Sequence, residues 1–216
     1  MKKEVFFGLD LDETIIHTVR VWGISDIPDD AEFFIYEDNK ITYAAYIRNH
    51  TAELLKYIDE NFTMFFYTRA ADFYAEQAIA ALGYKDTPLF HRGHTDIVKD
   101  KVFDAYNRES ERAYYKKDLN KIAKLLNTDI DNIIFVDDVV DNREITPTNC
   151  VIQIPEYTNT EDSDLKILIN HLKFFEKLED NFNFINCVRS LTYDIDIKEK
   201  KILKREEKKV VKIRNH

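Results

Sequence analysis

Acidic and hydroxyl side chains follow three short apolar runs of the sequence, each at the point where the run ends. They are Asp10 and Asp12 after Val5–Leu9, Thr68 after Phe62–Tyr67, and Asp137 and Asp138 after Ile133–Val136. In open α/β sheets the carboxyl ends of parallel strands meet at one edge, where active sites lie. Carboxylates gathered there repel one another unless a cation neutralises them, and such oxygen ligands suit Mg²⁺. The sequence therefore predicts a magnesium site built from these aspartates.

This set of residues fits phosphoryl chemistry. A carboxylate beside Mg²⁺ can attack phosphorus and form an aspartyl phosphate, while the metal offsets the repulsion between nucleophile and phosphate. A second carboxylate can protonate the leaving oxygen and then activate water. Thr68 can donate a hydrogen bond to a phosphate oxygen. A lysine must balance the remaining charge, and Lys116 and Lys117, just before an expected helix, are the two candidates.

The D-x-D spacing alone is weak evidence, because the sequence contains three further pairs: Asp129/Asp131, Asp162/Asp164 and Asp194/Asp196. The first pair combines a preceding apolar strand with a threonine, Thr14, two residues after Asp12. Asp129 and Asp131 come before a strand, at the other end of the sheet. Asp162 and Asp164 stand where a helix begins, and the helix dipole favours acids there. We therefore expect the three further pairs to be solvated turn or helix-cap acids.

The elements that must position these residues alternate between short apolar runs and amphipathic segments. Beyond the three runs above, we expect a strand over Val151–Ile154 and a β-hairpin of Phe33–Tyr36 and Ile41–Ile47, with Trp22 in hairpin or core rather than on a nucleic-acid stacking platform. We expect helices over Thr51–Glu60, Ala71–Leu82, Thr95–Glu111, Asp118–Leu126 and Asp164–Leu178. Such alternation predicts an α/β fold with a mostly parallel central sheet.

Composition excludes several classes of protein. The four glycines, Gly8, Gly23, Gly83 and Gly93, are too far apart for a dinucleotide fingerprint or a P-loop. The two cysteines, Cys150 and Cys187, predict reduced thiols rather than a disulfide framework. The first apolar run is too short for a signal peptide, and no stretch approaches the length of a membrane span. We therefore expect no membrane partner and a cytoplasmic protein, or a nuclear one in a eukaryote.

The charge is unevenly distributed along the chain. The net charge is −9, but residues 198–216 carry nine Lys/Arg against three Glu, so the remainder carries −15. An acidic body suits metal ions and small sites, whereas the basic tail 198–216 is the part expected to bind an acidic partner or nucleic acid.

The segment Asp10-Leu11-Asp12-Glu13-Thr14-Ile15-Ile16-His17 resembles the DLDETL-[IV]-H signature of haloacid dehalogenase (HAD) superfamily phosphatases. More narrowly, it is similar to the small C-terminal-domain phosphatases of RNA polymerase II, the NLI-interacting-factor-like family. The resemblance covers roughly residues 4–180. It implies a Rossmann-like HAD phosphatase domain over 1–180, with a β-hairpin insertion after the first strand. Residues 90–115 look longer than the matching stretch of the family, and we expect them to form a small helical insertion. Residues 181–216 would form a C-terminal extension.

The resemblance also implies a role for each residue of the motifs. Asp10 would be the nucleophile and Asp12 the general acid/base, whose backbone carbonyl also meets Mg²⁺. The other implied roles are phosphate binding by Thr68 and by Lys117 of Lys117-Asp118-Leu119, and metal binding by Asp10, Asp12 and Asp138 with Asp137 in support. We also expect Thr14 and Arg69 to contact the substrate.

Three departures from the family pattern bear on the substrate. Asn49 follows Arg48 where the family has proline, Arg69 replaces a small residue, and Asp141 follows the Asp137-Asp138 pair as a further carboxylate. Arg69 either contacts phosphate or points to solvent. The expected function is a Mg²⁺-dependent phosphatase acting on phosphoserine or phosphothreonine proteins. The alternatives are a phosphatase for nucleotides, nucleic-acid ends or small metabolites, and a non-catalytic scaffold of the same fold.

Overall fold

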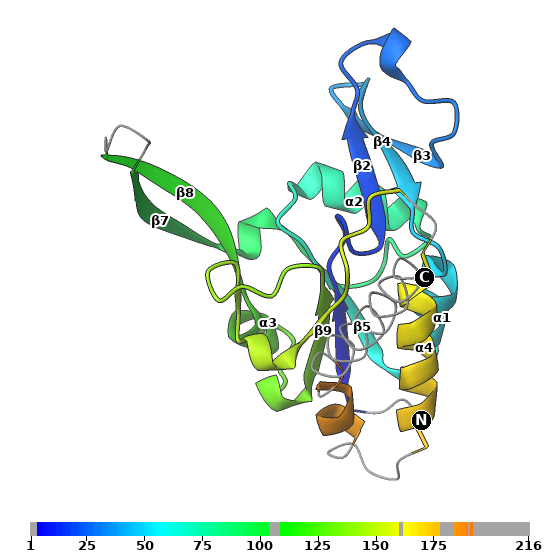
Figure 1. Cartoon of the computed structure of the whole chain (residues 1–216), viewed down its shortest axis with the longest axis vertical. Coiled ribbons are helices and arrows are strands. Elements are labelled where there is room, and N and C mark those ends of the chain that lie inside the picture. The colour runs from blue at the N-terminus through cyan, green and yellow to red at the C-terminus, as the bar shows by residue number, and fades with distance from the viewer. Residues whose placement is uncertain (1–3, 104–108, 160–161, 178–183, 190, 192–216) are drawn as a thin grey trace, which may run out of the picture.

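The computed structural model describes residues 4–103, 109–159, 162–177, 184–189 and 191 (Figure 1). Its centre is a five-stranded sheet in the order β11 (Val151–Gln153), β9 (Ile133–Asp137), β1 (Phe6–Leu9), β5 (Thr63–Tyr67) and β6 (Leu89–Phe90). Every neighbouring pair in this sheet is parallel. Short, almost wholly apolar strands are typical of a sheet covered on both faces. The predicted mostly parallel sheet is confirmed.

Helices cover both faces of the central sheet. Buried side chains of α1 (Thr51–Asn61), α2 (Asp72–Ala81) and α4 (Asp164–Phe175) share one hydrophobic cluster with Phe7 and Leu9. Those of α3 (Leu119–Leu125) share a second cluster with Phe65 and Phe135. Figure 1 shows α1 and α4 side by side. These four helices were expected from periodicity, and each lies close to its expected bounds.

Gly8 is the point in β1 where neighbouring rings require the absence of a side chain. Phe7 and Leu9 face the α1 side of the sheet, so Gly8 faces the other side. There the rings of Phe65 and Phe135 stack with centroids 6.1 Å apart. A Cβ atom on Gly8 would lie 2.3 Å from Cζ of Phe65 and 2.5 Å from Cδ2 of Phe135. Backbone and both rings would have to move to admit a methyl group.

We expect Gly8→Ala to lower the free energy of unfolding by about 1–3 kcal/mol, the usual cost of overpacking a core. Urea unfolding followed by circular dichroism measures this loss. Gly23→Ala is the matched control, because the nearest atom to its added Cβ would be 3.8 Å away. If Gly8→Ala and Gly23→Ala had the same urea midpoint of unfolding, the steric explanation would be wrong.

A second, antiparallel sheet follows the first strand of the central sheet. It has the order β2 (Ile16–Arg20), β4 (Lys40–Ile47) and β3 (Phe33–Glu37). The expected hairpin is confirmed as β3 and β4, and β2 adds a third strand that was not expected. Trp22 was expected in hairpin or core, and this is wrong. Its side chain is 78% exposed, and the guanidinium of Arg20 lies 4.3 Å from the ring centroid.

The prediction of a helix over Thr95–Glu111, and of a helical insertion near 90–115, is wrong. The segment forms an antiparallel hairpin of β7 (Asp96–Phe103) and β8 (Glu109–Asp118), which projects from the body as an arm (Figure 1). Residues four positions apart share a face on a strand as well as on a helix, so the apolar spacing of this segment did not distinguish the two. Pairing of β8 with β10 (Ile145–Thr146) joins the arm to the loop after β9.

The C-terminal part of the described chain adds to the core. Residues 184–189 are helical, and Phe184, Ile185, Val188 and Leu191 are buried in the same cluster as α1 and α4. The boundary at residue 180 stays a prediction. The expectations for Asp194, Asp196 and the basic tail 198–216 fall outside the described residues. Among the described helices, none has the length and apolar character needed to cross a membrane.

Candidate active site

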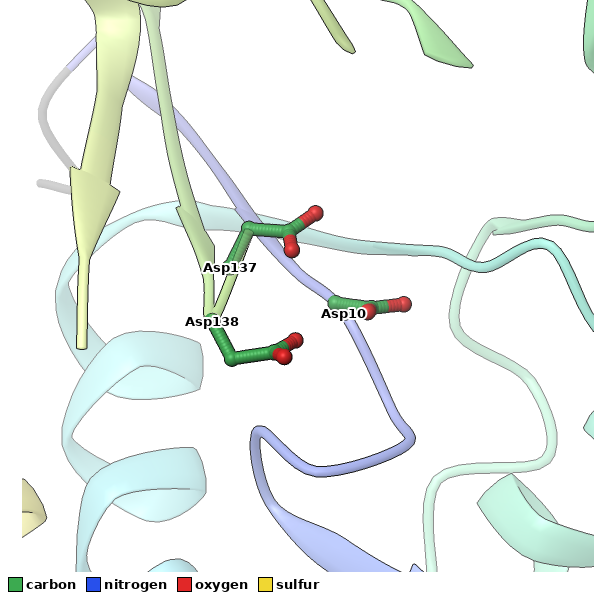
Figure 2. Close-up of side chains that lie close together, drawn as sticks. All are labelled: Asp10, Asp137 and Asp138. Carbon is green, nitrogen blue, oxygen red and sulfur yellow. The ribbon is translucent and has the colours of Figure 1, made fainter. Parts of the chain in front are cut away.

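The carboxyl ends of β1 and β9 bring three aspartates together. Leu9 is paired with Val136 in the register, and the Asp10 amide donates to the Val136 carbonyl at 3.0 Å. One carboxylate oxygen each of Asp10, Asp137 and Asp138 lies within 4.8 Å of the others (Figure 2). This is the predicted meeting of two acidic clusters at one sheet edge. The hard oxygen donors of the cluster fit Mg²⁺.

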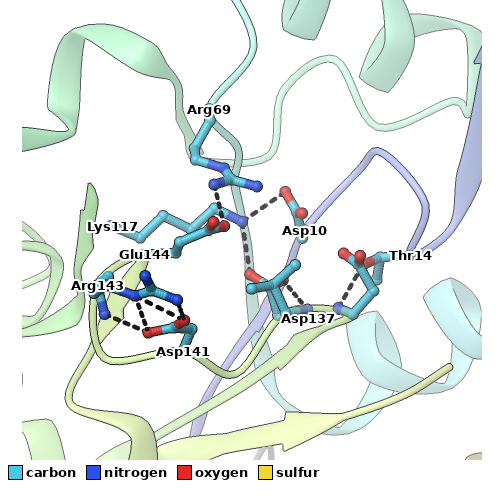
Figure 3. A network of polar contacts seen from close by, with 10 residues as sticks. Asp10, Thr14, Arg69, Lys117, Asp137, Asp141, Arg143 and Glu144 are labelled. Carbon is cyan, nitrogen blue, oxygen red and sulfur yellow. Dashed lines mark hydrogen bonds and ion pairs between the residues drawn. The ribbon is translucent and has the colours of Figure 1, made fainter. Parts of the chain in front are cut away.

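Lys117 supplies the positive charge of this cluster from β8. Its side chain is 2% exposed, and its Nζ lies 2.8 Å from Asp10 Oδ1 and 2.7 Å from Asp137 Oδ2 (Figure 3). Burial alone would lower the pKa of Lys117, but Asp10 and Asp137 outweigh burial and raise it. Neighbouring strand residues point to opposite faces, so Lys116 is directed away from the cluster. Of the two candidate lysines, the structure places Lys117 in the site.

Thr14 holds Asp138 on the other side of the cluster. The Thr14 hydroxyl donates to Asp138 Oδ1 at 3.3 Å and accepts the Asp138 amide at 3.1 Å. Asp137 is fixed through Oδ1, which accepts the Val139 amide at 2.8 Å. Thr14 is fully buried, so its hydroxyl orients an aspartate of the cluster. A direct substrate contact by Thr14 stays a prediction.

Arg48 connects the loop that carries Asp10 and Asp12 to two aspartates near the start of α4. Its buried guanidinium donates to the Thr14 carbonyl at 3.0 Å. It also forms ion pairs with Asp162 and Asp164, each at 2.9 Å. These two aspartates were expected to be solvated turn or cap acids. Asp164 does lie in the first turn of α4, but both carboxylates neutralise a buried arginine, which the local sequence could not indicate.

Asp12 is separated from the three-carboxylate cluster by its hydrogen-bond partner. Tyr74, from α2, donates from its hydroxyl to Asp12 Oδ1, and Thr18 Oγ1 lies 2.9 Å from the same hydroxyl. Burial raises the pKa of Asp12, and the Tyr74 hydrogen bond partly opposes this. A carboxyl group with a raised pKa that lies outside the three-carboxylate cluster is suited to carry a proton.

Thr68 and Arg69 are the two residues that directly follow the carboxyl end of β5. Thr68 is buried, and its Oγ1 accepts the Ala70 amide at 3.1 Å, which leaves the hydroxyl hydrogen to donate. Arg69 pairs with Glu144 of the loop after β9. Burial alone would lower the pKa of Arg69, but Glu144 and then Asp10 raise it. Arg69 lines the cavity described below, and its side chain is 37% exposed.

These side chains surround one cavity of about 550 Å³. Its lining includes Asp10, Asp12, Thr68, Arg69 and Asp138. Asp141, expected as a further carboxylate near the metal, instead pairs with Arg143 at 2.6 Å. Tyr74, Arg48 and Glu144 were missed at the sequence level. The only signal for Arg48 was the Arg-Asn departure from the family pattern.

The electrostatics of the cluster link folding stability to pH and to metal. Burial raises the pKa of Asp10 to about 7, with Lys117 opposing and Asp137 and Asp12 adding to the shift. Burial and the Asp137 charge raise the pKa of Asp138 to about 6. A carboxyl group whose folded pKa lies above its unfolded value binds more protons when folded, so stability falls as pH rises between the two values.

Without metal, we expect the protein to lose at least about 2 kcal/mol of stability between pH 5 and pH 8, or roughly 5 °C in melting temperature. Thermal unfolding in EDTA measures this. Adding Mg²⁺ at pH 8 should restore the loss, because a cation bound to the folded state neutralises the carboxylates. The Asp10→Asn variant should show a shallower pH dependence. A flat profile without a Mg²⁺ effect would contradict the metal assignment.

Comparison with known proteins shows the family to which the chain belongs. The family model described as NLI interacting factor-like phosphatase matches residues 8–183. A putative CTD phosphatase-like protein, 355R, of Invertebrate iridescent virus 6 is 26% identical over 181 residues, which cover 79% of this chain and 95% of the viral protein.

Among solved structures, the chain is similar to fission yeast RNA polymerase II CTD phosphatase Fcp1 bound to beryllium fluoride. The TM-score is 0.50 and the identity 15% over 94% of this chain. The chain spans 54% of that structure, and a second Fcp1 structure matches with a TM-score of 0.49. The first of these similarities supports the α/β fold with its mostly parallel sheet.

Proposed function

Because the chain belongs to the NLI interacting factor-like phosphatase family, we propose that it is a Mg²⁺-dependent phosphatase acting through an aspartyl phosphate on Asp10. Its substrate would be a phosphorylated protein, since the similar proteins are named as CTD phosphatases. The motif resemblance favours phosphoserine or phosphothreonine as the residue that is hydrolysed. The observation that carries the proposal is the separation of two carboxylates. Asp10 lies within the charged cluster beside Lys117, and Asp12 is held apart by Tyr74.

Asp10, Asp138 and the Asp12 carbonyl would hold Mg²⁺, with Asp137 in support, and the bound ion would offset the charge between carboxylate and phosphate. Lys117, Thr68 and Arg69 would bind phosphate oxygens. A carboxylate oxygen of Asp10 attacks phosphorus, and the bond from phosphorus to the leaving oxygen breaks. Asp12 supplies the proton that this oxygen takes up.

The second half of the cycle regenerates the enzyme. Asp12, now ionised, takes a proton from a water molecule whose oxygen attacks phosphorus. The bond between phosphorus and Asp10 breaks, inorganic phosphate leaves, and both aspartates return to their starting states. The same residue thus serves as acid and then as base.

Hydrolysis of p-nitrophenyl phosphate by the purified protein tests the proposal. We expect turnover with Mg²⁺, loss of turnover in EDTA, and recovery when Mg²⁺ is added back. Comparing phosphoserine peptides with nucleotides and phosphorylated metabolites then tests the substrate class. No turnover of any substrate with Mg²⁺ would favour the non-catalytic scaffold, and full turnover in EDTA would exclude metal dependence.

We expect Tyr74→Phe to slow hydrolysis of a phosphoserine peptide about tenfold, because it removes the hydrogen bond that orients Asp12. p-Nitrophenolate leaves without needing a proton, so hydrolysis of its phosphate should slow much less. The ratio of the two kcat values is the measurement. Tyr84→Phe is the control, since the Tyr84 ring packs against Phe66 away from Asp12. Equal losses for both substrates would show that Tyr74 acts only on folding or binding.

A further inference from the structure

Two arginines line the cavity of the candidate site without being neutralised by a described carboxylate. Arg20 and Arg92 both contribute to the cavity lining, yet neither forms an ion pair within the described part of the chain. Arg69 and Arg48, in the same region, do pair with acids. A guanidinium that faces a cavity with its charge unpaired is suited to binding a carboxylate or phosphate of a ligand.

Strand geometry directs Arg20 toward the cavity. Thr18 and Arg20 share one face of β2 because they are two residues apart. Thr18 on that face contacts the Tyr74 hydroxyl, which in turn binds Asp12. Arg20 therefore lies on the cavity side, about 7 Å farther along the strand than Thr18.

The exposed ring of Trp22 gives Arg20 a fixed support. The guanidinium lies 4.3 Å from the ring centroid, a cation–π distance. Trp22 is 78% exposed, so stacking on it does not remove Arg20 from solvent or from a ligand. A planar group restrained on a ring loses less freedom when it binds an anion. Glu37 shares this wall of the cavity, but it does not pair with Arg20.

Arg92 occupies a comparable position at the base of the β7–β8 arm. Its Nε donates to the Arg69 carbonyl at 3.0 Å, and its guanidinium lies 4.8 Å from the Tyr115 ring centroid. This arginine is thus tied to the strand end that carries Thr68. The arm and the β2–β4–β3 sheet project from different parts of the molecule (Figure 1). The two arginines therefore reach the cavity from separate structural elements.

We propose that Arg20 and Arg92 form two anion subsites that flank the phosphate being hydrolysed. The substrate would then be a peptide carrying acidic or phosphorylated residues near its phosphoserine or phosphothreonine. This inference rests on the proposed function and adds a substrate class to it.

Kinetics on a peptide series test the subsites. The reference peptide has one phosphoserine among neutral residues, and the others add a second phosphoserine at each position from three before to three after it. We expect kcat/KM to rise about tenfold or more at some positions, as a charged hydrogen bond provides. Each arginine should account for the rise in kcat/KM at a different set of peptide positions. Arg20→Gln should abolish the rise at one set, and Arg92→Gln should abolish it at the other. Turnover of p-nitrophenyl phosphate, which carries no second anion, should stay unchanged in Arg20→Gln.

Arg112→Gln is the matched control, because Arg112 lies on the arm outside this cavity. It should keep the wild-type preference. If wild-type protein hydrolyses p-nitrophenyl phosphate but treats all peptides alike, the subsites are wrong and the proposed function stands. Better turnover of polyphosphorylated nucleotides than of any peptide, lost in the same two variants, would overturn the peptide assignment.

Binding without turnover separates this inference from the proposed function. Trp22 is the single tryptophan of the chain, so its fluorescence reports on the group stacked against it. In the Asp10→Asn variant, a doubly phosphorylated peptide should change this fluorescence at lower concentrations than the reference peptide. The difference should shrink as salt is added. Equal titrations for both peptides would overturn the Arg20 subsite even if the protein hydrolysed nothing.

Discussion

Asp10→Asn is expected to reduce kcat for phosphate ester hydrolysis by about 10⁴-fold or more, the scale seen when a catalytic nucleophile is removed. An amide has no anionic oxygen to attack phosphorus, so the aspartyl phosphate cannot form. Steady-state kinetics measure the loss. Mass spectrometry after rapid quenching should show a phosphorylated adduct on wild-type protein and none on the variant.

Unfolding cannot explain this expected loss. Asp10 is buried beside Asp137, with a pKa raised to about 7, so the neutral amide removes repulsion and should leave the metal-free protein at least as stable. Asp131→Asn is the matched control, because Asp131 belongs to a D-x-D pair at the opposite end of β9. If Asp10→Asn kept the kcat of the wild-type protein, the assignment of Asp10 as the nucleophile would be wrong.

Lys117→Met should damage both stability and activity. The substitution leaves Asp10 and Asp137 buried without the cation that lies 2.8 Å and 2.7 Å from them. Removing one partner of a buried ion pair costs about 3–5 kcal/mol. Urea unfolding in EDTA at pH 8 should show that loss. Hydrolysis should fall by about 10³-fold, because a positive charge facing the phosphate is lost.

Mg²⁺ and a second substitution separate the two effects of Lys117. Mg²⁺ should recover part of the stability of Lys117→Met without restoring hydrolysis. Adding Asp137→Asn should also recover stability, since it removes one of the two unpaired charges, and activity should stay low. Lys116→Met, with its side chain on the other strand face, is the control for both assays. If Lys117→Met were as active and as stable as the wild-type protein, the assignment of Lys117 to the active site would be wrong.

The positions of the aspartates could be predicted because they depend on local sequence. Asp10 and Asp137 each follow a short apolar run, and parallel strands bring such ends to one sheet edge whatever the details of packing. The helices over 51–61 and 164–175 were predictable for the same reason. Their apolar positions repeat every three to four residues, which a strand cannot place on one face.

Tertiary structure decided the features that depend on pairing between distant segments. Residues 96–103 and 109–118 pair as two antiparallel strands, because strand pairing prevailed over an ambiguous four-residue spacing. Asp12 accepts a hydrogen bond from Tyr74, which is 62 residues away in the sequence. Arg48 donates to Asp162, which is 114 residues away. Burial makes such pairing obligatory, because an unpaired charge or hydroxyl in the core is costly. The sequence by itself determined which chemical groups reach the sheet edge. Only packing determined which partner each group received.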